Sequence, residues 1–132
     1  MTEARRVYHV WFSTKERRPI LDGEVGHYLR VSFAEIAKRT SIGLLEFEFA
    51  IDHVHVLLEI SSDKSLSSVM HQLKGASAHT IFLKYPDMRL ETRALWQKGY
   101  GFRSIAPSEV TGLRYYIRTQ SKRPVRREQA EG

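Results

Sequence analysis

The 132-residue sequence predicts an α+β protein in which helices pack on one face of a single antiparallel β-sheet. Segments with period-two hydrophobicity, typical of strands, alternate with segments of helical period in the order β-α-β-β-α-β-α. Two strand segments are separated by only a hairpin-length connection, which requires them to run antiparallel. A hydrophobic content of 42% is enough for one compact core, and no internal repeat or linker interrupts the chain.

Residues 5–14 predict the first strand, because aromatic and β-branched side chains alternate along them. His9 and Trp11 share one face of this strand, where His9 could reach a ligand or be packed as a structural histidine. The charged connection that follows carries three candidate phosphate-binding cations: Lys15, Arg17 and Arg18. A solvated turn explains these cations equally well.

Residues 22–39 predict a helix, since apolar side chains recur every three and four positions after Asp22, the expected N-cap. Residues 45–51 predict a second strand, with Leu45 and Phe47 on its buried face. Two carboxylates alternate with the apolar residues of this strand and suit a solvated face better than catalysis: Glu46 and Glu48.

Residues 51–60 predict the third strand, joined to the second by a hairpin at Ile51 and Asp52. Its core face is expected to hold Val54, Val56, Leu58 and Ile60. His53 and His55 fall on the opposite face, two residues apart, where both imidazoles could bind one metal ion. The alternative is a half-buried strand that carries two histidines by chance.

Residues 66–83 predict a second helix after a run of capping residues. Its buried stripe is expected to be Val69, Leu73, Ala76, Thr80 and Leu83. Gly75 lowers the stability of such a helix by about 1 kcal/mol relative to alanine, which close approach of another backbone or of a nucleic acid would explain. Lys74 beside it is a candidate phosphate contact.

The stretch 85–93 is predicted to be a turn followed by irregular chain. Two short strand pieces follow, at 94–97 and 100–105, split by a glycine-bearing bend. Their aromatic side chains could stack on unpaired bases, although core packing is the simpler explanation. Arg103 in the second piece is a further candidate DNA contact.

The last predicted helix runs from Pro107 to Gln120, with Val110, Leu113 and Ile117 as its buried stripe. Tyr116 and Gln120 lie one turn apart on a flank of that stripe, so they can face the same site. Tyr115 points nearly the opposite way.

The composition narrows the class of protein. No cysteine is present, which excludes disulfides, thiolate metal sites and cysteine nucleophiles. No apolar run reaches the length of a membrane span and no signal peptide is evident, so we expect an intracellular, cytoplasmic protein. The net charge of +6 favours a polyanionic partner, nucleic acid first. The basic segment 121–132 is expected to be a disordered tail or a DNA-contacting arm.

The element order is that of the ferredoxin-like fold, and the motifs on it resemble those of HUH-type single-tyrosine transposases of the insertion sequence 200/605 family. Five segments carry the resemblance in chain order: 8–11, 52–58, 73–77, 96–104 and 116–120. The sequence departs from the family at Glu16 and at Ala78 and His79, which bear on DNA contacts rather than on chemistry.

The resemblance implies a metal-dependent enzyme that cleaves and rejoins single-stranded DNA at insertion-sequence ends through a 5′-phosphotyrosine link. It implies Tyr116 as nucleophile and His53, His55 and Gln120 as ligands of one divalent ion, magnesium or manganese. It further implies one catalytic domain over residues 1–120 that recognises DNA hairpins. The family acts as a homodimer whose active sites are shared between the chains.

Two other functions fit the same residues. A non-catalytic nucleic-acid-binding module of ferredoxin-like fold would bind without a tyrosine adduct or metal dependence. A host-adopted relative acting on genomic repeats would share the chemistry and differ only in its genomic setting. A histidine phosphoesterase fits less well, because its paired histidines would normally come from separate strands.

Overall fold

The computed structural model describes residues 5–120, apart from the side chain of Gln120, and confirms the predicted α+β architecture. The predicted tail, residues 121–132, lies outside the described residues. The elements are β1 (Arg5–Ser13), α1 (Gly23–Thr40), β2 (Gly43–Phe49), β3 (His53–Ser61), α2 (Leu66–Lys84), α3 (Pro86–Thr92), β4 (Gly101–Ile105) and α4 (Val110–Gln120), with short 3-10 helices at Lys15–Arg17 and Pro107–Glu109.

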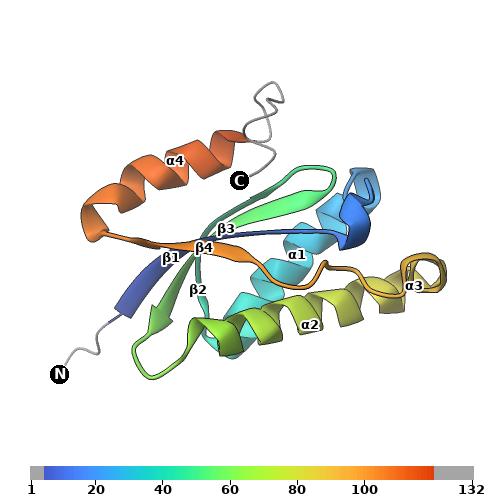
Figure 1. The fold of residues 1–132 in the computed structure, drawn as a ribbon, viewed down its shortest axis with the longest axis horizontal. Coiled ribbons are helices and arrows are strands. Elements are labelled where there is room, and N and C mark those ends of the chain that lie inside the picture. Colours follow the sequence, from blue (N-terminus) through green and yellow to red (C-terminus); the bar gives the residue numbers. More distant parts are fainter. Residues whose placement is uncertain (1–4, 121–132) are drawn as a thin grey trace.

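The four strands form one antiparallel sheet in the order β2-β3-β1-β4, which is the ferredoxin-like arrangement. Helices α1 and α2 cover one face of the sheet, and α4 lies across the other face (Figure 1). None of the helices in the described part is long and apolar enough to cross a membrane. The sheet therefore has a fully covered face and a face that α4 covers only in part.

The predicted core face of β3 is confirmed. Val54, Val56, Leu58 and Ile60 are all at most 1% exposed and pack beneath α1 and α2. Leu57, on the opposite face, is also fully buried, because it packs with Ile105 of β4 and Ile117 of α4 in a second, smaller cluster. Burial of these side chains holds helices on both faces of the sheet.

Ala76 of the predicted α2 stripe packs against the core, but the stripe is wrong at its end. Leu83 is 71% exposed, whereas Ser77 and Ile81 are buried. Ile81 and Leu83 are two residues apart, so they point to nearly opposite sides of the helix, and only Ile81 faces the core. Trp96 fixes this face, because its indole N–H donates to the Ser77 hydroxyl over 3.0 Å.

The segment after α2 also differs from the prediction, since α3 replaces the expected turn and irregular chain. Pro86 occupies the first turn of α3, where its missing N–H removes no hydrogen bond. At the start of α1, Asp22 is the N-cap as predicted, although its side chain makes no capping hydrogen bond.

The expected burial of Leu45 beside Phe47 is a further error, caused by a β-bulge. The register of β2 against β3 shifts between Leu44 and Glu46, so the alternation of faces breaks there. Leu44 and Phe47 consequently pack in the main core, while Leu45 packs against the α4 cluster. The bulge also places Glu46 on the α4 side.

Candidate functional site

The two histidines of β3 lie together at the edge of a pocket of about 200 Å³. The His53 and His55 rings have centroids 5.3 Å apart and come from the same face of the strand. Trp11 of β1 pairs with His55 and lines the same pocket. Its indole lies so close over Gly101 that a Cβ there would come within 2.1 Å of Nε1, so only glycine fits.

A third histidine, His9, fixes the orientation of His55. His9 lies diagonally across from His55, and the two rings meet at 3.0 Å between His9 Nε2 and His55 Nδ1. Both side chains are buried, at 8% exposure. If His55 Nδ1 carries the proton, it donates to His9 and leaves Nε2 of His55 as a free ligand nitrogen.

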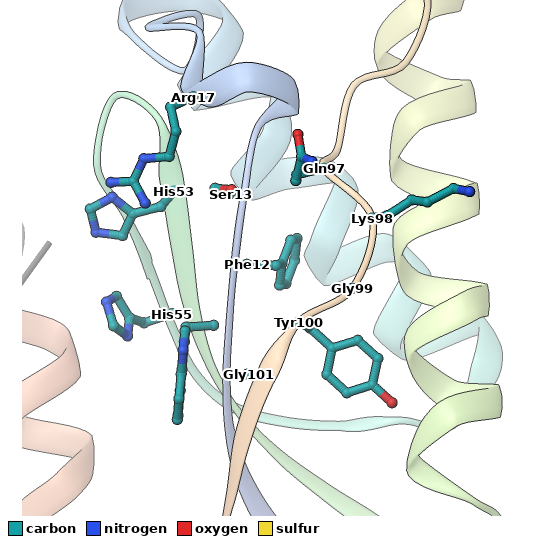
Figure 2. A pocket seen from close by; sticks show the side chains of 11 residues that line it. Phe12, Ser13, Arg17, His53, His55, Gln97, Lys98, Gly99, Tyr100 and Gly101 are labelled. Atoms are coloured by element: carbon teal, nitrogen blue, oxygen red, sulfur yellow. The ribbon is translucent and has the colours of Figure 1, made fainter. Parts of the chain in front are cut away.

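An aspartate holds His53 in the same way. His53 Nδ1 lies 2.8 Å from Asp52 Oδ1, and Arg17 reaches the other oxygen of Asp52 over 3.2 Å. A carboxylate only accepts hydrogen bonds, so Nδ1 of His53 carries a proton and Nε2 is the nitrogen left to accept another partner. Figure 2 shows the Arg17 side chain beside the His53 ring.

Arg17 adopts a backbone φ of 54°, a strained conformation that is often found at functional sites.

Burial keeps two of these imidazoles neutral. Burial and, to a lesser extent, Arg103 lower the pKa of His9 to about 4. Burial, followed by the charges of His9 and His53, lowers the pKa of His55 to about 3. Neutral imidazole is the form that binds metal ions, so these groups are in ligand form at neutral pH.

The same pKa shifts predict acid destabilisation. As pH falls below about 6.5, the unfolded chain binds protons that the folded chain does not, so the stability present above pH 6.5 is progressively lost. Between pH 7 and pH 5 the pair should lower the free energy of unfolding by roughly 2–4 kcal/mol. Urea unfolding in the presence of a chelator measures this loss. The His9→Gln variant should lose less unfolding free energy between pH 7 and pH 5 than the wild-type protein. The control is His71→Gln, at an exposed position, which should leave this loss unchanged. An unchanged pH dependence in His9→Gln would contradict the burial of His9 as a neutral imidazole.

The histidine pair supplies two of the donors that a metal site needs. Within residues 5–120 no group of three or more His, Asp or Glu side chains is placed to hold a metal ion. The third ligand predicted from the sequence is an amide, which is not one of these groups. The predicted candidate, Gln120, ends α4, and its side chain lies outside what the structure describes.

The predicted nucleophile lies on the helix that covers the histidine-bearing face. Tyr116 is half-buried against the cluster of Leu57, Ile105 and Ile117, while Tyr115 is 61% exposed. Two ion pairs tie α4 to β2, because Arg114 and Arg118 both reach Glu46, over 3.3 and 3.4 Å. Glu46 is thus a structural anchor for α4.

The five candidate DNA-binding cations occupy different places. Arg17 lines the histidine pocket, Lys15 begins the same 3-10 helix, and Arg18 is the C-cap residue that follows it. Arg103 lies on β4 beside Glu109, at 3.5 Å. Lys74 points inward and donates to the carbonyls of Gln97 and Gly99, each over 2.8 Å.

Sequence reasoning missed the roles of two residues in the site. Asp52 was treated only as part of a hairpin, although its position directly before His53 allows it to fix that ring. His9 was singled out as a strand histidine, but its contact with His55 depends on strand register, which the sequence leaves open.

Comparison with known proteins places the chain in a family. The sequence matches the family model described as "Transposase IS200 like" over residues 3–120. The chain belongs to this transposase family, which confirms the resemblance and the transposase function predicted from the motifs.

Relatives and solved structures agree with this assignment. The chain is 30% identical over 115 residues to the ISDra2 transposase TnpA of Deinococcus radiodurans, covering 86% of this chain and 82% of that protein. It is 33% identical over 95 residues to the IS200 transposase of Salmonella typhimurium, covering 70% of this chain and 62% of that one. The crystal structure of a Deinococcus radiodurans R1 protein described as a transposase superposes with a TM-score of 0.74 at 26% identity, covering 90% and 93% of the two chains. A REP-associated tyrosine transposase bound to a REP hairpin shares the fold, with a TM-score of 0.66 at 14% identity over 91% and 69% of the chains.

Proposed function

We propose that the protein cleaves and rejoins single-stranded DNA at insertion-sequence ends, using Tyr116 as the nucleophile and a divalent metal ion. One observation carries the proposal. The Nδ1 atoms of His53 and His55 are both engaged by protein partners, so the Nε2 atoms of the two imidazoles are left to bind a ligand from one rigid strand. Histidines that bind metal ions are commonly held in this way. The chain also belongs to a transposase family.

The proposed chemistry is an exchange of phosphodiester bonds. The Tyr116 oxygen forms a bond to a backbone phosphorus, and the bond from that phosphorus to the 3′-oxygen breaks. The tyrosine hydroxyl loses its proton and the departing 3′-oxygen gains one. A 5′-phosphotyrosine and a free 3′-hydroxyl result, and reversal with a different 3′-hydroxyl rejoins the strand without a high-energy cofactor.

His53, His55 and Gln120 would hold one divalent ion. When bound, the ion would polarise the phosphate and offset the charge that develops on its oxygens. Imidazole ligands favour manganese over magnesium, whereas the family resemblance allows either. The roles of His9 and Asp52 follow directly, because each fixes the tautomer and the orientation of one ligand.

The proposed assembly is a homodimer that acts on hairpin-bearing DNA in the cytoplasm. The proposed catalytic domain spans residues 1–120, and in it α4 follows a short connection after β4. Such a helix can serve the histidine pair of a partner chain. The similarity in fold to a transposase bound to a REP hairpin supports hairpin DNA as the substrate.

The test is a denaturing gel of the protein incubated with hairpin-bearing single-stranded DNA and Mn²⁺ or Mg²⁺. A 3′-labelled strand should shift to the mass of a protein–DNA adduct, while a 5′-labelled strand should give a shorter free product. Binding without an adduct would instead identify a non-catalytic nucleic-acid-binding module. A shift of the 5′ label would reverse the proposed polarity.

A further inference from the structure

A second hollow lies next to the histidine pocket. It occupies about 490 Å³ between α2 and the segment 93–100, and we call it the α2 groove. The groove and the histidine pocket share residues 97–100, so they adjoin along this segment. In Figure 2 the Lys98 side chain points towards α2, away from His53 and His55.

The α2 groove is positively charged. Lys74, Arg93 and Lys98 line it, and none of its described lining residues is acidic. Arg93 and Lys98 are exposed, and neither forms an ion pair with a side chain of residues 5–120. Arg93 also adopts a φ of 68°, which a long side chain rarely does. The groove is therefore complementary to a polyanion.

The wall of the groove is fixed in place. The Lys74 ammonium donates to the carbonyls of Gln97 and Gly99, each over 2.8 Å, which ties the segment 97–99 to α2. Burial lowers the pKa of Lys74, consistent with an ammonium used inside the protein rather than in solvent. The groove is thus preorganised, and its solvent-facing cations are Arg93 and Lys98.

Gly75 lies in the wall that α2 contributes. A Cβ at this position would meet no protein atom within 4 Å, and the backbone is ordinary α-helix. Neither packing nor conformation therefore requires glycine, although glycine weakens a helix relative to alanine. Close approach of a bound ligand would explain it, since the open space beside Gly75 is the groove itself.

We propose that the α2 groove binds the backbone of the single-stranded DNA that continues from the histidine pocket across residues 97–100. Arg93 and Lys98 contact phosphates, and the bare backbone at Gly75 lets the strand approach the helix closely. This inference rests on the proposed function for the identity of the strand, and its test does not depend on cleavage.

The test measures binding of a fluorescent hairpin with a single-stranded extension, by anisotropy in EDTA. Arg93→Gln and Lys98→Gln should each weaken binding by roughly three- to tenfold at 0.1 M salt and reduce the slope of log affinity against log salt by about 0.7. Lys38→Gln, an exposed cation on α1 outside both hollows, is the matched control and should bind normally. Gly75→Ala should raise the melting temperature by about 2–5 °C and yet weaken binding.

Equal affinities in the Lys98→Gln and Lys38→Gln variants would overturn the groove proposal. An equal loss for a blunt hairpin without the extension would also overturn it, since the groove would then hold the duplex. Adduct formation is assayed in parallel on the wild-type protein. A normal adduct from the wild-type protein together with unchanged affinities in the groove variants would refute the groove proposal alone. Lowered affinities in the groove variants without any adduct from the wild-type protein would support the groove and refute Tyr116 as the nucleophile.

Discussion

Tyr116→Phe is expected to abolish the covalent protein–DNA adduct, lowering cleavage by at least about a thousandfold, because no other group replaces the attacking oxygen. Tyr116 is half-buried against the α4 cluster, so loss of its hydroxyl keeps the aromatic packing. DNA binding by the variant should remain normal. The denaturing gel measures the first effect and anisotropy measures the second.

Tyr115→Phe provides the matched control, since it removes the same hydroxyl from the adjacent residue. Tyr115 is 61% exposed, and its side chain lies outside the cluster that holds α4 on the sheet. The adduct should form in this variant at the normal rate. An adduct that survives Tyr116→Phe and disappears in Tyr115→Phe would exchange the roles of the two tyrosines.

His53→Ala is expected to remove metal-dependent cleavage while the fold persists. The His53 side chain is 23% exposed and contributes little to the core, so the melting temperature measured without metal should change only slightly. One of the two imidazole donors is lost, and Mn²⁺ affinity measured by calorimetry should fall by more than about a hundredfold. His55→Ala should have the same effect on metal but also lower stability, because His55 is buried.

The partners of these ligands should show intermediate effects. His9→Phe and Asp52→Ala each leave both ligands in place but remove one hydrogen-bond acceptor, which typically weakens metal binding by about 10–100-fold. His9→Gln retains an acceptor and should recover part of the loss. Full metal-dependent cleavage in the double variant His53→Ala/His55→Ala would rule out a metal role for the pair.

The sequence predicts the local features of this site well. Alternation along a strand is set by the backbone itself, so the shared face of His53 and His55 and the buried face of Val54 and Val56 follow from spacing alone. The exposure of Tyr115 follows from helical period in the same way.

Features that depend on contacts between distant segments are not predictable in this way. The bond between His9 and His55 requires the register of β1 against β3, and the bulge at Leu45 carries no glycine that would reveal it. The inward turn of Lys74 depends on carbonyls more than twenty residues away. By contrast, Pro86 was a readable signal for the start of α3 that our sequence analysis did not use.

The attachment of α4 to β2 makes the docking of the helix dependent on ionic strength. Both of its ion pairs converge on Glu46 from arginine side chains that are 44% and 55% exposed, where salt screens the attraction strongly. The apolar cluster beneath α4 is small, so local release of the helix requires far less free energy than unfolding of the sheet. Added salt therefore shortens the time that α4 stays docked on its own sheet.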